Sequence, residues 1–99
     1  MDITPTRAFL VTLSAATSAQ IVAPNQARKG LRWMNIGLNP MTVTPGAAAA
    51  VVGQGMAYNG AAGAGQQGGS ECFEGTAVPG DAFQAISTLG TTVIVWEQN

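Results

Sequence analysis

Carboxylates are the most numerous side chains that could perform acid–base chemistry in this sequence of 99 residues. Four of them fall late in the chain: Glu71, Glu74, Asp81 and Glu97. A glycosidase needs two carboxylates that face each other across a cleft of roughly 5–9 Å. Glu71 and Glu74 are three residues apart, so a regular strand would point them to opposite faces. We therefore expect solvated surface acids rather than a catalytic pair.

A single cysteine, Cys72, is the next candidate, and the sequence contains no histidine. Without histidine there is no imidazole base to activate the thiol and no His-ligated metal. One cysteine also excludes an internal disulfide, and no D-x-D-x-D spacing offers calcium a set of oxygen ligands. We expect Cys72 to be a small buried hydrophobe in a protein made in a reducing cytoplasm. The sequence predicts no enzyme, no cofactor and no metal.

A glycine motif and a basic cluster are the remaining patterns with possible chemistry. Residues 63–68 match the dinucleotide-binding pattern G-x-G-x-x-G, but residues 69–72 cannot open the helix that this pattern requires. Arg28, Lys29 and Arg32 form the only basic cluster, and no aromatic residues interleave with them. So few cations make a weak nucleic-acid site. We expect a solvated turn or a salt bridge to an acidic neighbour, and no nucleic-acid partner.

Short strands are the elements that must position these side chains. Pro- and Gly-containing turns recur roughly every 8–12 residues, and no helical periodicity extends beyond one turn. The expected strands cover residues 7–14, 18–23, 31–36, 41–44, 48–52, 71–74, 82–88 and 91–97. The sequence therefore predicts one all-β domain over residues 1–99, a compact antiparallel sandwich of about eight short strands. Its core is expected to include Trp33, Ile36, Val43, Phe83, Ile86 and Val95.

The distribution of charge suggests that a partner covers part of the surface. Charged residues make up only 9% of the sequence, and none occurs from Trp33 to Ser70. Monomeric β-proteins usually protect their edge strands with charges, so this neutral surface favours association. Residues 53–69 are rich in glycine and predict a long flexible loop or two loosely specified strands, ordered by a neighbouring subunit. No stretch of about 20 apolar residues occurs, so we expect no membrane partner.

Two parts of the sequence resemble small virion proteins of tailed bacteriophages. The first part comprises residues 28–37 and 39–43, and the second comprises residues 71–74, 78–80, 85–87 and 90–97. The resemblance implies a compact β-sandwich, often jelly-roll-like, that decorates or cements the head shell or forms the foot of a fibre. It brings no catalytic residues to this chain.

The expected function is therefore structural. The chain would decorate or cement a phage capsid through apolar and main-chain contacts with the major capsid protein or other virion proteins. It would be a homo-oligomer, dimer or trimer, located in the virion after synthesis in the host cytoplasm. The candidate partner contacts are Arg28, Lys29, Arg32, Tyr58, Gly63 and Gly65. The alternative is a fibre or tail module that binds a receptor or glycan, with Trp33, Tyr58 and Trp96 as stacking platforms.

Overall fold

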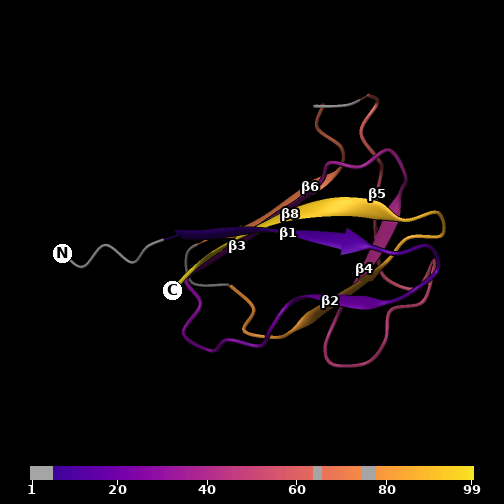
Figure 1. Cartoon of the computed structure of the whole chain (residues 1–99). Helices are drawn as coiled ribbons and strands as arrows, with labels where there is room; N and C mark the ends of the chain where they lie inside the picture. The colour runs from indigo at the N-terminus through magenta and orange to yellow at the C-terminus, as the bar shows by residue number, and fades with distance from the viewer. Residues whose placement is uncertain (1–5, 64–65, 75–77) are drawn as a thin grey trace.

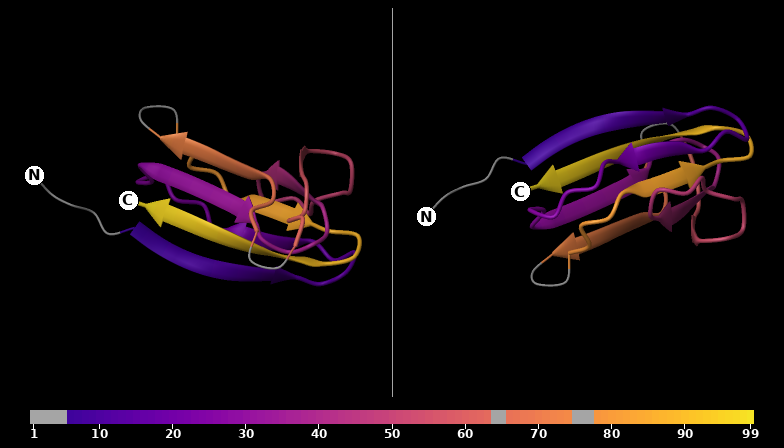
Figure 2. Two further views of the ribbon diagram at one scale, coloured as in Figure 1. Left: turned by 90° about the horizontal axis from the view of Figure 1, so that it is seen from above. Right: turned by 90° about the horizontal axis from the view of Figure 1, so that it is seen from below.

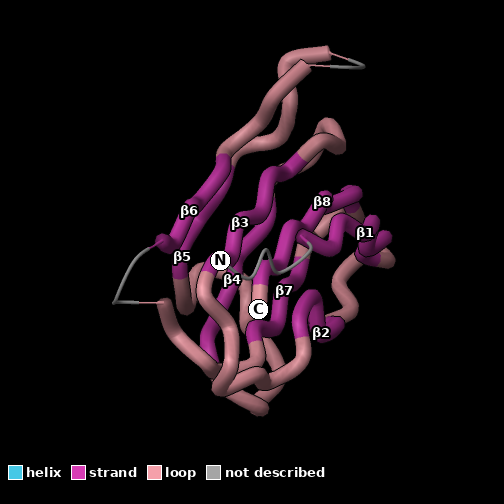
Figure 3. The backbone as a smooth tube through the Cα atoms, turned by 90° about the vertical axis from the view of Figure 1, so that its left-hand side faces the viewer, coloured by secondary structure: helices cyan, strands magenta, loops and turns pink. Residues whose placement is uncertain are grey.

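The computed structural model describes residues 6–63, 66–74 and 78–99 and shows two four-stranded sheets packed face to face (Figures 1 and 3). The strands are β1 (Thr6–Leu13), β2 (Ala19–Val22), β3 (Gly30–Asn35), β4 (Met41–Pro45), β5 (Met56–Tyr58), β6 (Ser70–Glu74), β7 (Phe83–Ile86) and β8 (Thr91–Gln98). The first sheet has the order β1-β8-β3-β6, and the second has the order β2-β7-β4-β5. The described residues contain no helix long and apolar enough to cross a membrane.

The strand pairing is that of a jelly roll. β1 pairs with β8, β2 with β7, β3 with β6 and β4 with β5, all antiparallel. The chain is thus one long hairpin that bends over itself, so that alternate strand pairs enter alternate sheets. The prediction of an antiparallel, jelly-roll-like sandwich of about eight strands is confirmed.

Alternating side chains build the core between the sheets. Along β8, buried and half-buried residues alternate from Thr91 to Glu97, and Trp33 lies on the inward face of β3 with no exposed surface. The Trp33 ring lies 4.9 Å from Phe83 and 5.6 Å from Phe73, centroid to centroid. Four of the six predicted core residues are fully buried, whereas Ile36 and Ile86 are only half-buried.

The uncharged middle of the sequence differs most from expectation. Residues 48–52 were expected to form a strand but are a loop with one isolated bridge, between Val51 and Gln54. The glycine-rich segment contains one strand, β5, which pairs with β4. The alternative of loosely specified strands is therefore right in part. Alanine and valine alone do not decide whether a segment pairs, because pairing also needs a free neighbouring edge.

Candidate interaction surfaces

Within the described ranges, no group of three or more His, Cys, Asp or Glu side chains could hold a metal ion. Glu71 and Glu74 point to opposite faces of β6, as predicted, and Glu71 is half-buried. Cys72 is exposed, so the prediction of burial is wrong; its side chain lies on the outer face of an edge strand. Local desolvation, followed by the charge of Glu74, raises the pKa of the Cys72 thiol, which disfavours the nucleophilic thiolate.

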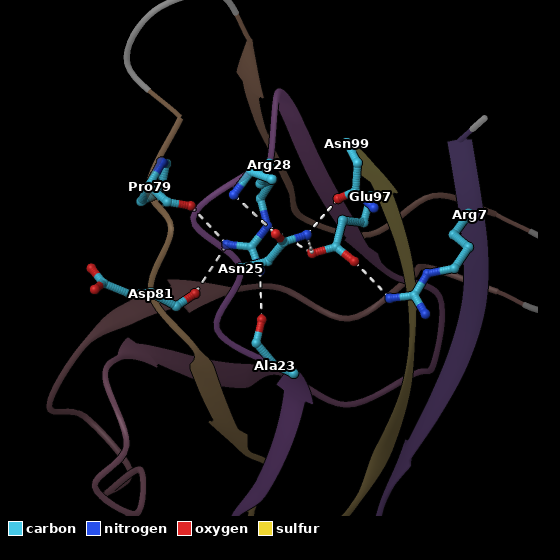
Figure 4. A network of polar contacts seen from close by, with 9 residues as sticks. Arg7, Ala23, Asn25, Arg28, Pro79, Asp81, Glu97 and Asn99 are labelled. Carbon is cyan, nitrogen blue, oxygen red and sulfur yellow. Dashed lines mark hydrogen bonds and ion pairs between the residues drawn. The ribbon is translucent and has the colours of Figure 1, made fainter. Parts of the chain in front are cut away.

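Arg28 is buried at the centre of a polar network where β8 ends (Figure 4). Its Nε donates a hydrogen bond of 2.8 Å to Oε2 of Glu97. Its terminal nitrogens donate to three backbone carbonyl oxygens, those of Ala23 at 2.6 Å, Pro79 at 2.7 Å and Asp81 at 3.0 Å. The guanidinium group therefore joins β8 to the segments that follow β2 and precede β7.

Glu97 is the buried anion of this network, contrary to the expectation that the late carboxylates are solvated. Besides the bond from Arg28, it accepts hydrogen bonds from Nη2 of Arg7 at 2.6 Å and from Nδ2 of Asn25 at 3.3 Å. Burial acts to raise the pKa of Glu97, but these hydrogen bonds outweigh it and hold the pKa below its ordinary value of 4.5. Glu97 alternates in step with Val93 and Val95 along the sequence, so it shares their inward face of β8.

The basic cluster is therefore divided between core and surface. Arg28 forms the expected salt bridge to an acidic neighbour, Glu97, and is buried in the single chain. Lys29 and Arg32 are exposed. The Arg32 guanidinium lies over the Trp96 ring, 5.2 Å from its centroid, so this cation already has an aromatic neighbour on the same chain.

Tyr58 and Trp33 are also buried in the single chain. Tyr58 is buried on the inward face of β5, with its ring edge-on to Trp33 at 6.0 Å. Its hydroxyl donates a hydrogen bond of 3.2 Å to Oε2 of Glu71. Burial, followed by the charge of Glu71, raises the pKa of Tyr58 to about 12. In the single chain Tyr58 and Trp33 are therefore buried, whereas Trp96, the third proposed platform, is half-buried.

The first sheet has an open outer face. It is formed by the outward residues of β1, β8, β3 and β6, which the register places in adjacent rows. The outer face comprises Ala8, Leu10, Arg32, Met34, Ser70, Cys72, Glu74, Ile94 and Trp96. Leu10 lies in the middle row of this face, in register with Ile94 and Met34, and is 63% exposed.

The second sheet lacks such a face because residues 46–55 fold back over its outer side (Figure 1). The backbone N–H of Ala50 donates to Oγ of Ser18 at 2.8 Å, and that of Gly53 donates to Oγ1 of Thr42 at 3.3 Å. Gln84 reaches the carbonyl oxygen of Gly46 at 3.2 Å. The outer side of this sheet carries Thr and Gln side chains that hydrogen-bond to the chain's own loop.

The described residues at the end of the sandwich opposite the polar network carry no charge. Asn35 is buried there, donates to the carbonyl oxygen of Asn39 at 2.8 Å, and accepts from the Thr91 hydroxyl at 2.7 Å. Asn39 in turn donates to the carbonyl oxygen of Gly90 at 2.7 Å. These bonds join the β3–β4 turn to the β7–β8 turn.

Glycines allow further segments to pack against this uncharged end. A Cβ atom on Gly60 would collide with the carbonyl group of Leu38, and one on Gly68 would collide with the carbonyl oxygen of Asn35. The Gly68 N–H donates to that same oxygen at 2.9 Å. The nearest atoms to a Cβ on Gly63 would belong to the Gln66 side chain, at 3.7 Å, which is ordinary contact, and Gly65 lies outside the described residues.

Comparison with known proteins identifies no relative. No family model matches the chain, no curated protein matches it, and no solved structure matches its fold.

Proposed function

We propose that this protein is a non-enzymatic structural component of a tailed-bacteriophage particle that decorates or cements the capsid shell. It binds the major capsid protein or another virion protein through the outer face of its first sheet, and it resides in the virion after synthesis in the host cytoplasm. The sequence resemblance suggests the particle. The observation that carries the mode of binding is that one outer face is covered by the chain itself while the other is open.

The chemistry of the outer face supports attachment by apolar burial. Leu10, Ile94 and Met34 form its middle row, and Arg32 is stacked on Trp96 beside it. Exposed ion pairs contribute only about 0–1 kcal/mol each, whereas each buried leucine side chain contributes about 1.5–3 kcal/mol. Repetition of a modest contact over a symmetric shell sums to a large stabilisation. Jelly rolls occur in viral capsid proteins and also in lectins, so the fold agrees with the proposal without establishing it.

A pair of matched substitutions tests the proposal on purified particles that carry the protein. Leu10→Asp places a carboxylate on the outer face, and Val52→Asp places one on the segment that covers the second sheet, where Val52 is 52% exposed. We expect Leu10→Asp to reduce the number of copies per particle strongly and Val52→Asp to leave it unchanged. Equal occupancy of both variants would exclude the outer face as the attachment surface.

Salt resistance is the second part of this test. Apolar contacts are not screened, so the protein should remain bound when sodium chloride is raised to about 1 M, where the Debye length is about 3 Å. Release at moderate salt would indicate an electrostatic contact through Lys29 and Arg32 instead. Removal of a cementing protein should also lower the force or temperature at which the shell ruptures.

The fibre or tail alternative is favoured by one feature of the same face. Trp96, Arg32, Glu74 and Gln98 line a shallow hollow of about 190 Å³, where a sugar could meet an aromatic ring and planar polar groups. Binding of the isolated protein to a glycan array, lost in Trp96→Ala, would support a receptor-binding module. Few copies per particle would favour it over cement, which requires hundreds.

A further inference from the structure

One edge of β1 is covered by no described strand. β1 pairs with β8 on one side and stands at the end of the sheet order β1-β8-β3-β6. Both views of Figure 2 show β1, in indigo, along one long border of the molecule. Its pairing with β8 runs from Thr6 to Leu13 without a register shift, so the uncovered edge is regular over eight residues. An edge of this kind presents unpaired backbone groups to which a further strand can bind.

The other three edge strands are protected against such pairing. β2 has four residues and a shift in its register, and β5 has only three residues. β6 has five residues and carries the carboxylates of Glu71 and Glu74. Short length, irregular register and charge all discourage edge-to-edge pairing. β1 is long and regular, it contains no proline, and its one charged residue, Arg7, lies near its beginning.

Hydrogen bonds of β3 determine which backbone groups of β1 are free. The Ile36 N–H donates to the carbonyl oxygen of Thr92 on β8, whereas the Asn35 N–H donates to that of Gly69, on the β6 side, each at 2.9 Å. Backbone groups alternate in direction along a strand, so even-numbered residues of β8 face β3 and odd-numbered ones face β1. Odd-numbered residues of β8 lie opposite odd-numbered residues of β1. The uncovered edge therefore presents the N–H and C=O groups of Thr6, Ala8, Leu10 and Thr12.

A second copy of β1 can satisfy all of these groups at once. In an antiparallel pair centred on Phe9, Thr6 lies opposite Thr12 of the second copy, and Ala8 lies opposite its Leu10. Each of these is a pair that exchanges two hydrogen bonds. A register centred one hydrogen-bonded step away in either direction leaves one end of β1 without a partner in the other β1. The positions of the free groups therefore select the register centred on Phe9.

The side chains agree with this register. Phe9 would face Phe9 of the second copy in a non-hydrogen-bonded pair, where Cα atoms approach to about 4.5 Å and aromatic rings interact favourably. Phe9 is half-buried in the single chain and packs against the rim of the core, so it has surface left to bury. Arg7 would lie opposite Val11, which keeps the two Arg7 side chains at opposite ends of the paired segment. The register thus brings no like charges together.

We propose that two copies of the chain pair through β1, so that their first sheets join into one continuous sheet. The occupant of the edge must be a strand of the same length with its own backbone groups free, and β1 is the one described strand of this chain that offers this. The contact is isologous and closed, because a two-fold axis uses the same edge on both copies. It is made by main-chain groups rather than by the attachment surface, so it stands independently of the proposed function.

Sedimentation equilibrium of the isolated full chain tests the proposal with a matched pair of variants. Ala8→Pro removes an N–H that points away from β8, and proline is tolerated at such an edge position. Ala8→Ser keeps this N–H at the same exposed position and is the control. The parent protein and Ala8→Ser should form dimers, whereas Ala8→Pro should dimerise roughly 30-fold more weakly, because each dimer loses two hydrogen bonds. Thermal melts check that both variants are folded.

Disulfide cross-linking tests the register, in a Cys72→Ser background because Cys72 is exposed. Phe9→Cys places two thiols across the two-fold axis, within the range of a disulfide. Val11→Cys is the control on the same face of β1, and its two thiols would be offset by roughly 13 Å along the strands. Under mild oxidation Phe9→Cys should give a covalent dimer and Val11→Cys should remain a single chain.

Several results would overturn the proposal. A monomeric parent protein would exclude self-pairing, and reduced copy number of Ala8→Pro on particles would then assign the edge to a strand of another protein. Dimerisation of Ala8→Pro at the parent's strength would place the self-contact elsewhere on the molecule. Equal weakening by Ala8→Ser would make the contact one of side chains on the outer face. Equal cross-linking of Phe9→Cys and Val11→Cys would contradict the register.

Discussion

The two ends of the sandwich are fastened by different chemistry. At one end, Arg28 and Glu97 form a buried ion pair that joins several segments (Figure 4). At the other end, segments are joined by hydrogen bonds of the neutral Asn35 side chain and by the close packing of Gly60 and Gly68. The first end uses strong charges that are satisfied internally, whereas the second uses none. The described turns at the second end therefore carry no charged side chain, whereas the charges at the first end are paired within the chain.

The largest effect is expected from breaking the charged end. Arg28→Ala leaves Glu97 buried without its main partner and leaves three backbone carbonyl oxygens without a donor. Removal of one member of a buried ion pair costs about 3–5 kcal/mol, so the free energy of unfolding should fall by that amount in urea titrations. Lys29→Ala, at the exposed neighbouring residue, is the control and should change it by less than about 0.5 kcal/mol. Similar values for both would mean that the network does not stabilise the fold.

A smaller loss is expected from the neutral end. Gly68→Ala forces a methyl group against the carbonyl oxygen of Asn35, so the backbone must shift. Overpacking of this kind costs about 1–3 kcal/mol, which a thermal or urea melt would detect. Gly63→Ala belongs to the same segment but meets only the flexible Gln66 side chain, so it should be close to neutral. If both substitutions were neutral, the glycines would serve flexibility rather than packing.

The smallest expected effect is a difference in how the stability of variants at the two ends depends on pH. The folded-state pKa of Glu97 lies below 4.5, so its contribution to stability is complete above that value and is lost as pH falls through the lower folded-state pKa. Glu97→Gln should therefore lose less stability than the parent protein on acidification below pH 4.5, although it is less stable at neutral pH. Gly68→Ala should keep the acid dependence of the parent protein. Parallel curves for the parent and Glu97→Gln would contradict the role assigned to Glu97.

The fold was largely predictable because strand alternation is local. Trp33 alternates with exposed and half-buried neighbours along β3, and its burial was predicted correctly, whereas Ile36, three residues further on, is only half-buried. The partner of Arg28 lies 69 residues away on β8, so no local pattern could show that this cation is buried. The role of Gly68 was missed for the same reason: the sequence shows that a side chain is absent but not which carbonyl oxygen fills the space.

The candidate partner contacts were predicted less well than the fold. Tyr58 is an aromatic residue of the glycine-rich segment and was proposed as a stacking platform, yet its strand pairs with β4 and turns the ring inward. The outer face was not anticipated as a unit, since it gathers alternate residues from four strands that are distant in sequence. The exposure of Leu38 and Leu89 could have been predicted from the sequence, because each is a large apolar residue within a turn.

The pairing of the first strand with the last has a consequence for how the chain folds. Among the strands that pair with each other, β4 and β5 are separated by the shortest connection, residues 46–55, so they can meet early. The pairs β3–β6, β2–β7 and β1–β8 each enclose the pairs before them in the sequence. Such non-local pairing places the protein among slow folders, on the timescale of about milliseconds to seconds. The ion pairs of Glu97 with Arg7 and Arg28 would form when the last pair closes. Substitutions there should accelerate unfolding and leave the folding rate almost unchanged.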